Sequence, residues 1–294
     1  MHQYIEDVYR GNITDVSDFN QKLHNKLFEL ELMDLDFPSE VIKKSFVKDM
    51  DHFTKNFNKL DGEFTLEKMF VSQIGEHYLL GYIDAIRSTK DENDNKKIEV
   101  VDWKTSSKFT GSKLEHAGRQ LVIYKLGLEQ TTDMQINEIK WCMLKYIYVC
   151  WVQQNGKVKK KMVNRGKLIK EMTKTFEKEM IKSGMDEIEV GLSIMNAEAN
   201  NSFTDLPSII TDKYWLEDCF IEYEATDKVI KEVEDYVVNT IEEIESKDIH
   251  NESVWKPLDF DKEGTFYCNT LCSHRKTCGF IAQYNKENPF KRSF

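Results

Sequence analysis

An aspartate and a lysine two residues apart, Asp102 and Lys104, follow an apolar row in the segment IEVVDWKTS. Because side chains alternate along a strand, Asp102 and Lys104 share the face that holds the apolar Val100. A buried charge is costly unless it is paired or binds a metal. The pair therefore indicates either a structural ion pair or a reaction centre.

A second carboxylate, Asp84, lies in the preceding strand-like segment LLGYIDAI, on the face predicted to hold Tyr82 and Ile86. If the two strands pair antiparallel, Asp84 comes close to Asp102. Adjacent carboxylates repel each other, and a divalent cation between them relieves the repulsion. Oxygen ligands with open positions suit Mg²⁺ or Mn²⁺, which also bind phosphate oxygens. With Lys104 to orient water and stabilise charge, these groups suit phosphodiester hydrolysis.

The elements that must position these residues follow from the periodicity. Residues 1 to 58 predict helices, one of them capped at Ser17. Three strand-like segments then predict an antiparallel meander, and their sequences are FTLEKMFVSQI, HYLLGYIDAIRS and KIEVVDWKTS. After the meander we expect a helix over 113–129, then a strand that turns at NGK into another strand. Two more helices are expected over 167–183 and 226–247. Residues 186–223 give no clear assignment and suggest an insertion.

The composition indicates a globular protein, since 40% of the 294 residues are hydrophobic and only four are proline. We expect one domain over 1–294, with a core over about 20–165 and a helical, cysteine-containing part over about 166–294. No apolar run reaches the roughly 20 residues of a membrane helix, and the first residues do not resemble a signal peptide. A cytoplasmic location without membrane partners is therefore the expectation.

The net charge of −10 argues against coating nucleic acid by bulk electrostatics, although local contacts remain open. One segment, NGKVKKKMVNRGKLIK over 155–170, has seven basic residues and no acidic one. We interpret it either as a solvated surface or as a local contact for DNA.

Three motifs resemble those of one nuclease family. GYIDAI, VVDWKTS and QLVIY match, in order, the G-x-x-D, D-x-K and Q-x-x-x-Y motifs of RecB-type nucleases in the PD-(D/E)XK superfamily. The resemblance implies an α/β, restriction-endonuclease-like fold, with a mixed β-sheet flanked by helices and helical additions at both ends. It also implies that Asp84 and Asp102 bind the metal, that Lys104 is catalytic, and that Gln120 and Tyr124 lie near the site and the DNA.

Two further residues of the family pattern have candidates here. A glutamate recurs on the first strand, where this chain has Glu67, and a histidine recurs on an early helix. His24 matches that histidine best as a metal ligand, and His52 is a weaker candidate. The implied function is a metal-dependent DNA exonuclease in recombination, repair or phage-type DNA processing, with a helicase or another recombination protein as partner. The alternative is a nuclease-fold subunit that binds DNA or a partner without cutting.

Three cysteines near the C-terminus, Cys268, Cys272 and Cys278, resemble the trio that helps to hold a [4Fe–4S] cluster in some RecB-type nucleases. The first spacing here is C-x3-C instead of C-x2-C, and no cysteine precedes Cys142 to act as the usual fourth ligand. His274 lies inside the segment, and zinc accepts histidine whereas iron–sulfur clusters mostly take thiolates. An iron–sulfur cluster, a zinc ion and a metal-free remnant all stay open.

Overall fold

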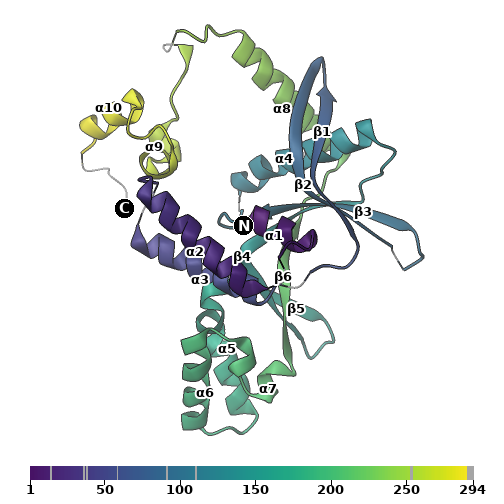
Figure 1. The fold of residues 1–294 in the computed structure, drawn as a ribbon, viewed down its shortest axis with the longest axis vertical. Helices are drawn as coiled ribbons and strands as arrows, with labels where there is room; N and C mark the ends of the chain where they lie inside the picture. Colours follow the sequence, from purple (N-terminus) through teal and green to yellow (C-terminus); the bar gives the residue numbers. More distant parts are fainter. Residues whose placement is uncertain are drawn as a thin grey trace.

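The computed structural model is a mixed sheet with helices on both faces and at one end (Figure 1). It describes residues 1–13, 15–35, 37, 39–57, 59–90, 92–109, 111–251 and 254–289. The α/β class and the mixed sheet flanked by helices are as predicted. Among these residues no helix is both long and apolar enough to cross a membrane.

Six strands form the sheet. They are β1 Glu63–Ile74, β2 His77–Lys90, β3 Lys96–Lys104, β4 Glu138–Val152, β5 Val158–Asn164 and β6 Tyr214–Glu222. The first three form the predicted antiparallel meander, and β4 runs parallel to β3. A parallel pair needs a crossover connection, which helix α4 (Ser112–Thr131) supplies.

Strand β6 corrects the prediction of an insertion over 186–223. It pairs antiparallel with β4, so residues 214–222 belong to the central sheet, while the rest of that range forms helices α6 and α7. The β4–β6 register shifts between Cys142 and Ile147, which marks an irregularity in the ladder. The sequence of β6, YWLEDCFIE, has no clean apolar alternation, and this explains why its strand character was missed.

The remaining helices precede the sheet or follow β5. They are α1 His2–Tyr9, α2 Val16–Leu32, α3 Glu40–Lys55, α5 Leu168–Lys182, α6 Glu187–Asn200, α7 Ser208–Thr211, α8 Asp227–Glu245, α9 Phe260–Glu263 and α10 Gly279–Glu287. The cap of α2 is Asp15 instead of the predicted Ser17, because the Asp15 carboxylate accepts a hydrogen bond from the Ser17 N–H. Thr226 caps α8.

Three apolar clusters hold these layers together. The first lies between the sheet and helices α4 and α8, and the second lies on the other face, against α1, α2 and α3. The third joins β4 and β5 to α5, α6 and α7, which gather at one end of the molecule (Figure 1). Val100 belongs to the first cluster and Val101 to the second, so β3 is buried on both faces as its alternating pattern predicts.

Candidate active site

The two predicted carboxylates lie at facing positions of neighbouring strands. The antiparallel register pairs Ala85 of β2 with Val101 of β3, so Asp84 and Asp102 occupy the next positions along. Asp102 is only 1% exposed. An oxygen of Asp84, Oδ2, accepts a hydrogen bond of 2.9 Å from the Trp103 backbone N–H. The sheet therefore brings both carboxylates to one place.

Asp102 has an unusual electrostatic environment. Burial, with a smaller effect from the neighbouring Asp84, raises the pKa of Asp102 to about 6, although Lys104 opposes the shift. Its Oδ2 forms an ion pair of 2.6 Å with Lys104 Nζ, yet this buried oxygen has no partner with hydrogen-bond geometry among the described residues. A buried, incompletely satisfied carboxylate facing another carboxylate is a suitable donor set for a divalent cation.

His2, at the start of α1, lies against the carboxylate pair, although no sequence pattern had singled it out. Its Nδ1 lies 3.3 Å from Asp84 Oδ2, and this contact raises the pKa of His2. Burial acts to raise the pKa of Asp84, but His2, the Trp103 N–H and Lys104 together hold it below the ordinary value. No local pattern in the sequence marks a lone histidine on a short first helix as functional. The family resemblance implies a histidine on an early helix, and this is the one hint that could have pointed to His2.

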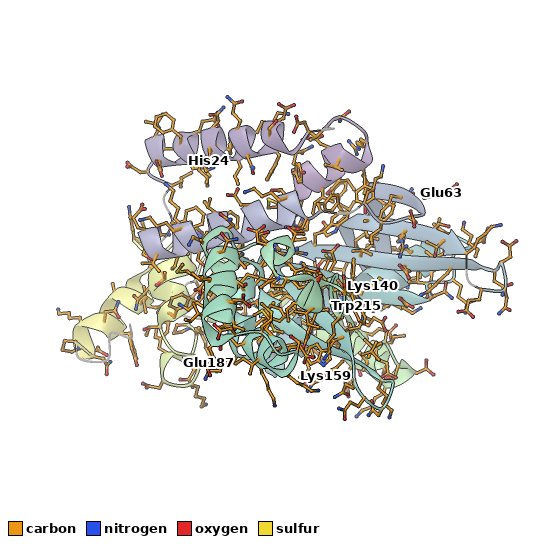
Figure 2. All side chains as sticks on the ribbon, turned by 90° about the horizontal axis from the view of Figure 1, so that it is seen from below. His24, Glu63, Lys140, Lys159, Glu187 and Trp215 are labelled. Atoms are coloured by element: carbon orange, nitrogen blue, oxygen red, sulfur yellow. The ribbon has the colours of Figure 1, made fainter. Side chains whose placement is uncertain are left out.

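The two histidines chosen from the sequence lie elsewhere. His24 is exposed on α2, the outermost helix in Figure 2. His52 is buried in α3, and burial, with Arg165 and Lys55 nearby, lowers its pKa to about 4. A histidine surrounded by cations in the interior is a core residue, and neither His24 nor His52 has a contact with Asp84 or Asp102 among the described residues.

Helix α4 completes a polar chain that begins at Asp102. Lys104 Nζ donates a hydrogen bond of 2.9 Å to Gln120 Oε1, and Gln120 Nε2 donates one of 2.5 Å to the Tyr124 hydroxyl. Gln120 and Tyr124 are four residues apart, so they share one side of the helix. The Tyr124 ring meets the Phe70 ring edge-on at 5.3 Å, which holds this side of α4 against the sheet.

A glycine allows α4 to lie this close. A Cβ added at Gly127 would stand 2.3 Å from the ring of Phe70, far inside contact distance. Gly127, about one helical turn after Tyr124, therefore permits the close approach of α4 to Phe70 on β1. We infer that Gly127 and Phe70 together set the depth at which Gln120 reaches Lys104.

Glu67, the predicted first-strand glutamate, lies opposite Asp84, since its neighbours Leu66 and Lys68 pair with Ala85 and Ile83. Its φ of 49° is rare for a residue other than glycine, and such strain is often found at functional sites. Burial, followed by the charges of Asp84 and Glu6, raises the pKa of Glu67.

The alternation of β2 changes at this point. Ile83 and Ile86 both belong to the cluster under α4, although they are three residues apart. Tyr82 is 55% exposed while Ile86 is buried, so the prediction that Asp84 shares a face with both was wrong for Tyr82. The positive φ at Glu67, directly across the ladder, coincides with this change of face.

The three C-terminal cysteines follow one another before α10: Cys268 lies in the short helical turn Tyr267–Leu271, Cys272 ends that turn, and Cys278 stands at the start of α10. Their thiols are free and partly exposed, and Cys278 directly precedes the helix. Burial, and then the charges of Cys272 and Cys278, raises the pKa of Cys268. His274 is exposed between Cys272 and Cys278.

Over the described parts of the chain, no group of three or more His, Cys, Asp or Glu side chains is arranged to hold a metal ion. This result has different consequences for the predicted Mg²⁺ or Mn²⁺ site at the carboxylates and for the predicted metal site at the cysteines. Mg²⁺ usually keeps several waters and uses one or two carboxylates plus substrate phosphates, so two facing carboxylates suffice. Structural zinc and iron–sulfur clusters need about four protein ligands. The cluster and zinc readings of the cysteines therefore stay predictions.

The basic segment lies on β5, away from the carboxylates in strand order. Lys160 pairs with Glu217, Lys161 donates to the Glu171 carbonyl at 2.8 Å, and Lys159 stands 5.5 Å from the Trp151 ring centre. Its role in DNA binding stays a prediction.

Comparison with known proteins gives one match. The family model described as PD-(D/E)XK nuclease superfamily matches residues 1–279. This span contains His2, both carboxylates, Lys104 and the whole of α4. Neither the curated proteins nor the solved structures gave a significant match.

Proposed function

The chain belongs to the PD-(D/E)XK nuclease superfamily, and on this premise we propose that it is a deoxyribonuclease that uses Mg²⁺ or Mn²⁺. The observation that carries the proposal is that Asp84 and the buried Asp102 face each other across β2 and β3, with Lys104 Nζ 2.6 Å from Asp102 Oδ2. These two carboxylates would hold the cation. When bound, it would polarise the phosphate and lower the pKa of water.

His2 has a positioning role in this proposal. Its contact with Asp84 Oδ2, together with the bond from the Trp103 N–H, restricts the rotation of that carboxylate. Residues that orient a metal-binding carboxylate in this way commonly affect metal affinity. His2 therefore replaces His24 as the histidine that we assign to the site.

Lys104 brings positive charge to the phosphate. Its ammonium group lies between Asp102 and Gln120 and is partly exposed, with 22% of the side chain accessible. Hydrolysis breaks a P–O bond and forms another to water, so negative charge builds up on the phosphate oxygens. An ammonium fixed at the edge of the site stabilises that charge and orients the water. Gln120 and Tyr124 keep Lys104 in this position.

Exonuclease action is the finer part of the proposal. It rests on the similarity of the three motifs to those of RecB-type nucleases, which also suggests a role in DNA recombination, repair or phage-type processing with a helicase as a candidate partner. The acidic net charge of −10 agrees with a protein that holds DNA at a local site instead of along a broad basic surface.

The test is a cleavage assay with the full chain on end-labelled single-stranded and double-stranded DNA, in Mg²⁺, Mn²⁺ or EDTA. We expect cleavage that needs the metal and is lost in Asp102→Asn and Lys104→Ala. Asp94→Asn is the matched control, because Asp94 and Lys96 have the same D-x-K spacing but Asp94 is exposed in a loop. Product length separates exonuclease from endonuclease action.

Two results would contradict the proposal. If Asp102→Asn cuts as fast as the wild type, the carboxylate of Asp102 has no role in the reaction. Wild-type protein that binds DNA but never cuts it would favour the alternative of a non-cleaving subunit.

A further inference from the structure

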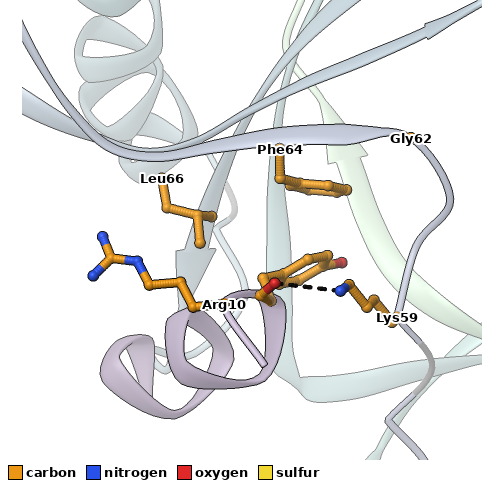
Figure 3. Close-up of a pocket in the computed structure, with 6 residues that line it drawn as sticks. Arg10, Lys59, Gly62, Phe64 and Leu66 are labelled. Atoms are coloured by element: carbon orange, nitrogen blue, oxygen red, sulfur yellow. Dashed lines mark hydrogen bonds between the residues drawn. The ribbon is translucent and has the colours of Figure 1, made fainter. Parts of the chain in front are cut away.

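A pocket of about 320 Å³ opens between the end of α1 and the start of β1 (Figure 3). The residues that line it are Tyr9, Arg10, Lys59, Gly62, Phe64 and Leu66. Phe64 and Leu66 point from the strand toward α1, and Arg10 and Lys59 stand on opposite sides of the pocket. The volume falls within the range of sites for small ligands.

The pocket adjoins the carboxylate pair. Leu66, in its wall, directly precedes Glu67, which lies opposite Asp84. Arg10 is near enough to Glu67 to act on its pKa, as is His2. The helical rise of about 1.5 Å per residue puts His2 and Arg10 about 12 Å apart along α1. A stacked strand covers that distance in about four nucleotides, at about 3.4 Å each.

Two kinds of side chain meet in this pocket. The rings of Tyr9 and Phe64 lie 4.1 Å apart and provide an apolar wall. Arg10 pairs with Glu6 at 2.5 Å but is half exposed, so some of its five N–H donors remain open to a ligand. Lys59 is exposed and donates to the Tyr9 carbonyl at 3.3 Å. Aromatic rings beside cations are the combination that binds single-stranded nucleic acid.

We propose that this pocket binds one nucleotide of the substrate strand, a few positions from the bond that is cut. This inference rests on the proposed function and extends it to the path of the strand. Arg10 and Lys59 bind the phosphate of that nucleotide, and Phe64 contacts its base. The strand then runs along α1 from Arg10 to the site at His2 and Asp84.

The first test measures binding of a fluorescent single-stranded oligonucleotide to the full chain carrying Asp102→Asn, over a series of salt concentrations. Lys59→Gln and Arg10→Gln should each weaken binding and reduce the slope of log Kd against log salt by about 0.7, the value for one phosphate contact on a single strand. Lys182→Gln, on an exposed lysine of α5, is the control and should change neither quantity.

The second test locates the base. Oligonucleotides with one abasic position each are bound to the same protein, and one position should lose about tenfold in affinity, as expected for a lost stacking contact. In Phe64→Leu, which keeps an apolar side chain in the wall, that loss should disappear while the other positions behave as before. The melting temperature of each variant verifies that it is folded.

Unchanged salt slopes for both cation variants, with no position-specific loss that depends on Phe64, would overturn the pocket proposal. If Asp102→Asn and Lys104→Ala still abolish cleavage, the proposed function survives that result. A wild-type protein that cuts double-stranded DNA but binds no single-stranded oligonucleotide would overturn the pocket proposal alone, and one that neither binds nor cuts DNA of either kind would overturn both.

Discussion

Strand β3 buries two acidic residues, Glu99 and Asp102, whose surroundings differ. Glu99 is 3% exposed and pairs with three cations, and the distances are 3.0 Å to Arg87, 2.9 Å to Lys97 and 2.9 Å to Lys140. Burial acts to raise the pKa of Glu99, but these cations lower it to about 2. Asp102, equally buried, has one lysine and a facing aspartate, and its pKa rises to about 6.

The difference separates a structural ion-pair network from the site that we propose as the reaction centre. Glu138 and Lys140 have the same spacing as Asp102 and Lys104, yet both belong to the network around Glu99. There the cations outnumber the carboxylates, so no further charge is needed. Around Asp102 two carboxylates share one lysine and a histidine, and an additional cation would be stabilised. The motif alone does not distinguish the two cases, because the charges that decide come from neighbouring strands.

The largest expected effect is on catalysis. Asp102→Asn should lower the cleavage rate by about 10³-fold or more, because a group that acts on the transition state is lost. Glu99→Gln, assayed at a temperature at which it is folded, should still cut. The measurement is the single-turnover rate on labelled DNA in Mg²⁺. Equal losses in the two variants would erase the distinction between the regions.

For stability we expect the reverse order: Glu99→Gln should be the more damaging change, and Asp102→Asn the milder one. Glu99→Gln removes one partner from a buried network and leaves cations uncompensated, which should cost about 3 kcal/mol of the free energy of unfolding. Asp102→Asn removes one of two repelling carboxylates, so the metal-free protein should be at least as stable as the wild type. Urea denaturation in EDTA compares the three proteins, and a destabilised Asp102→Asn with an unaffected Glu99→Gln would reverse our assignment.

The network around Glu99 should also weaken in acid. The pKa of Glu99, about 2, lies below the value of 4.5 expected in the unfolded chain. The contribution of ionised Glu99 to the free energy of unfolding is therefore complete above pH 4.5 and is lost as the pH falls toward 2. The stability difference between the wild type and Glu99→Gln should therefore shrink over that window. Urea denaturation at pH 7, 4.5 and 3 measures it, and a constant difference would contradict the ion-pair explanation.

The smallest of these effects concerns metal binding. At a Mg²⁺ concentration ten times the Kd, binding to the folded state alone should add about 1.4 kcal/mol to the stability of the wild type. Glu99→Gln should gain the same increment, whereas Asp84→Asn and Asp102→Asn should gain much less. Thermal melts with Mg²⁺ or EDTA measure the increment. A full gain in Asp102→Asn would place the cation elsewhere.

Several features were predictable because they depend on local spacing. The period of two in IEVVDWK puts Asp102 and Lys104 on one face of β3, and the four-residue interval puts Gln120 and Tyr124 on one side of α4. The strands of the meander and the turn into β5 follow from the same kind of pattern. The structure joins Asp102, Lys104, Gln120 and Tyr124 in one chain of contacts.

Other features depend on contacts between distant parts of the chain. The choice of His2 over His24 follows from where α1 packs against the middle of β2, at Asp84, which no local pattern encodes. Strand β6 is stabilised by pairing with β4 along a charged sequence with no clear alternation. The pocket at Arg10 and Lys59 likewise joins α1 to the start of β1 across about fifty residues.

The sequence by itself indicated a nuclease and determined which side chains share a face, because residue types and their periodicity define those faces. The tertiary structure decided which charges surround each buried carboxylate: Glu99 has three cationic partners, whereas Asp102 has Lys104 and the facing Asp84. The physical reason is that the electrostatic energy of a buried group depends on every charge within a few ångströms, whatever its distance along the chain.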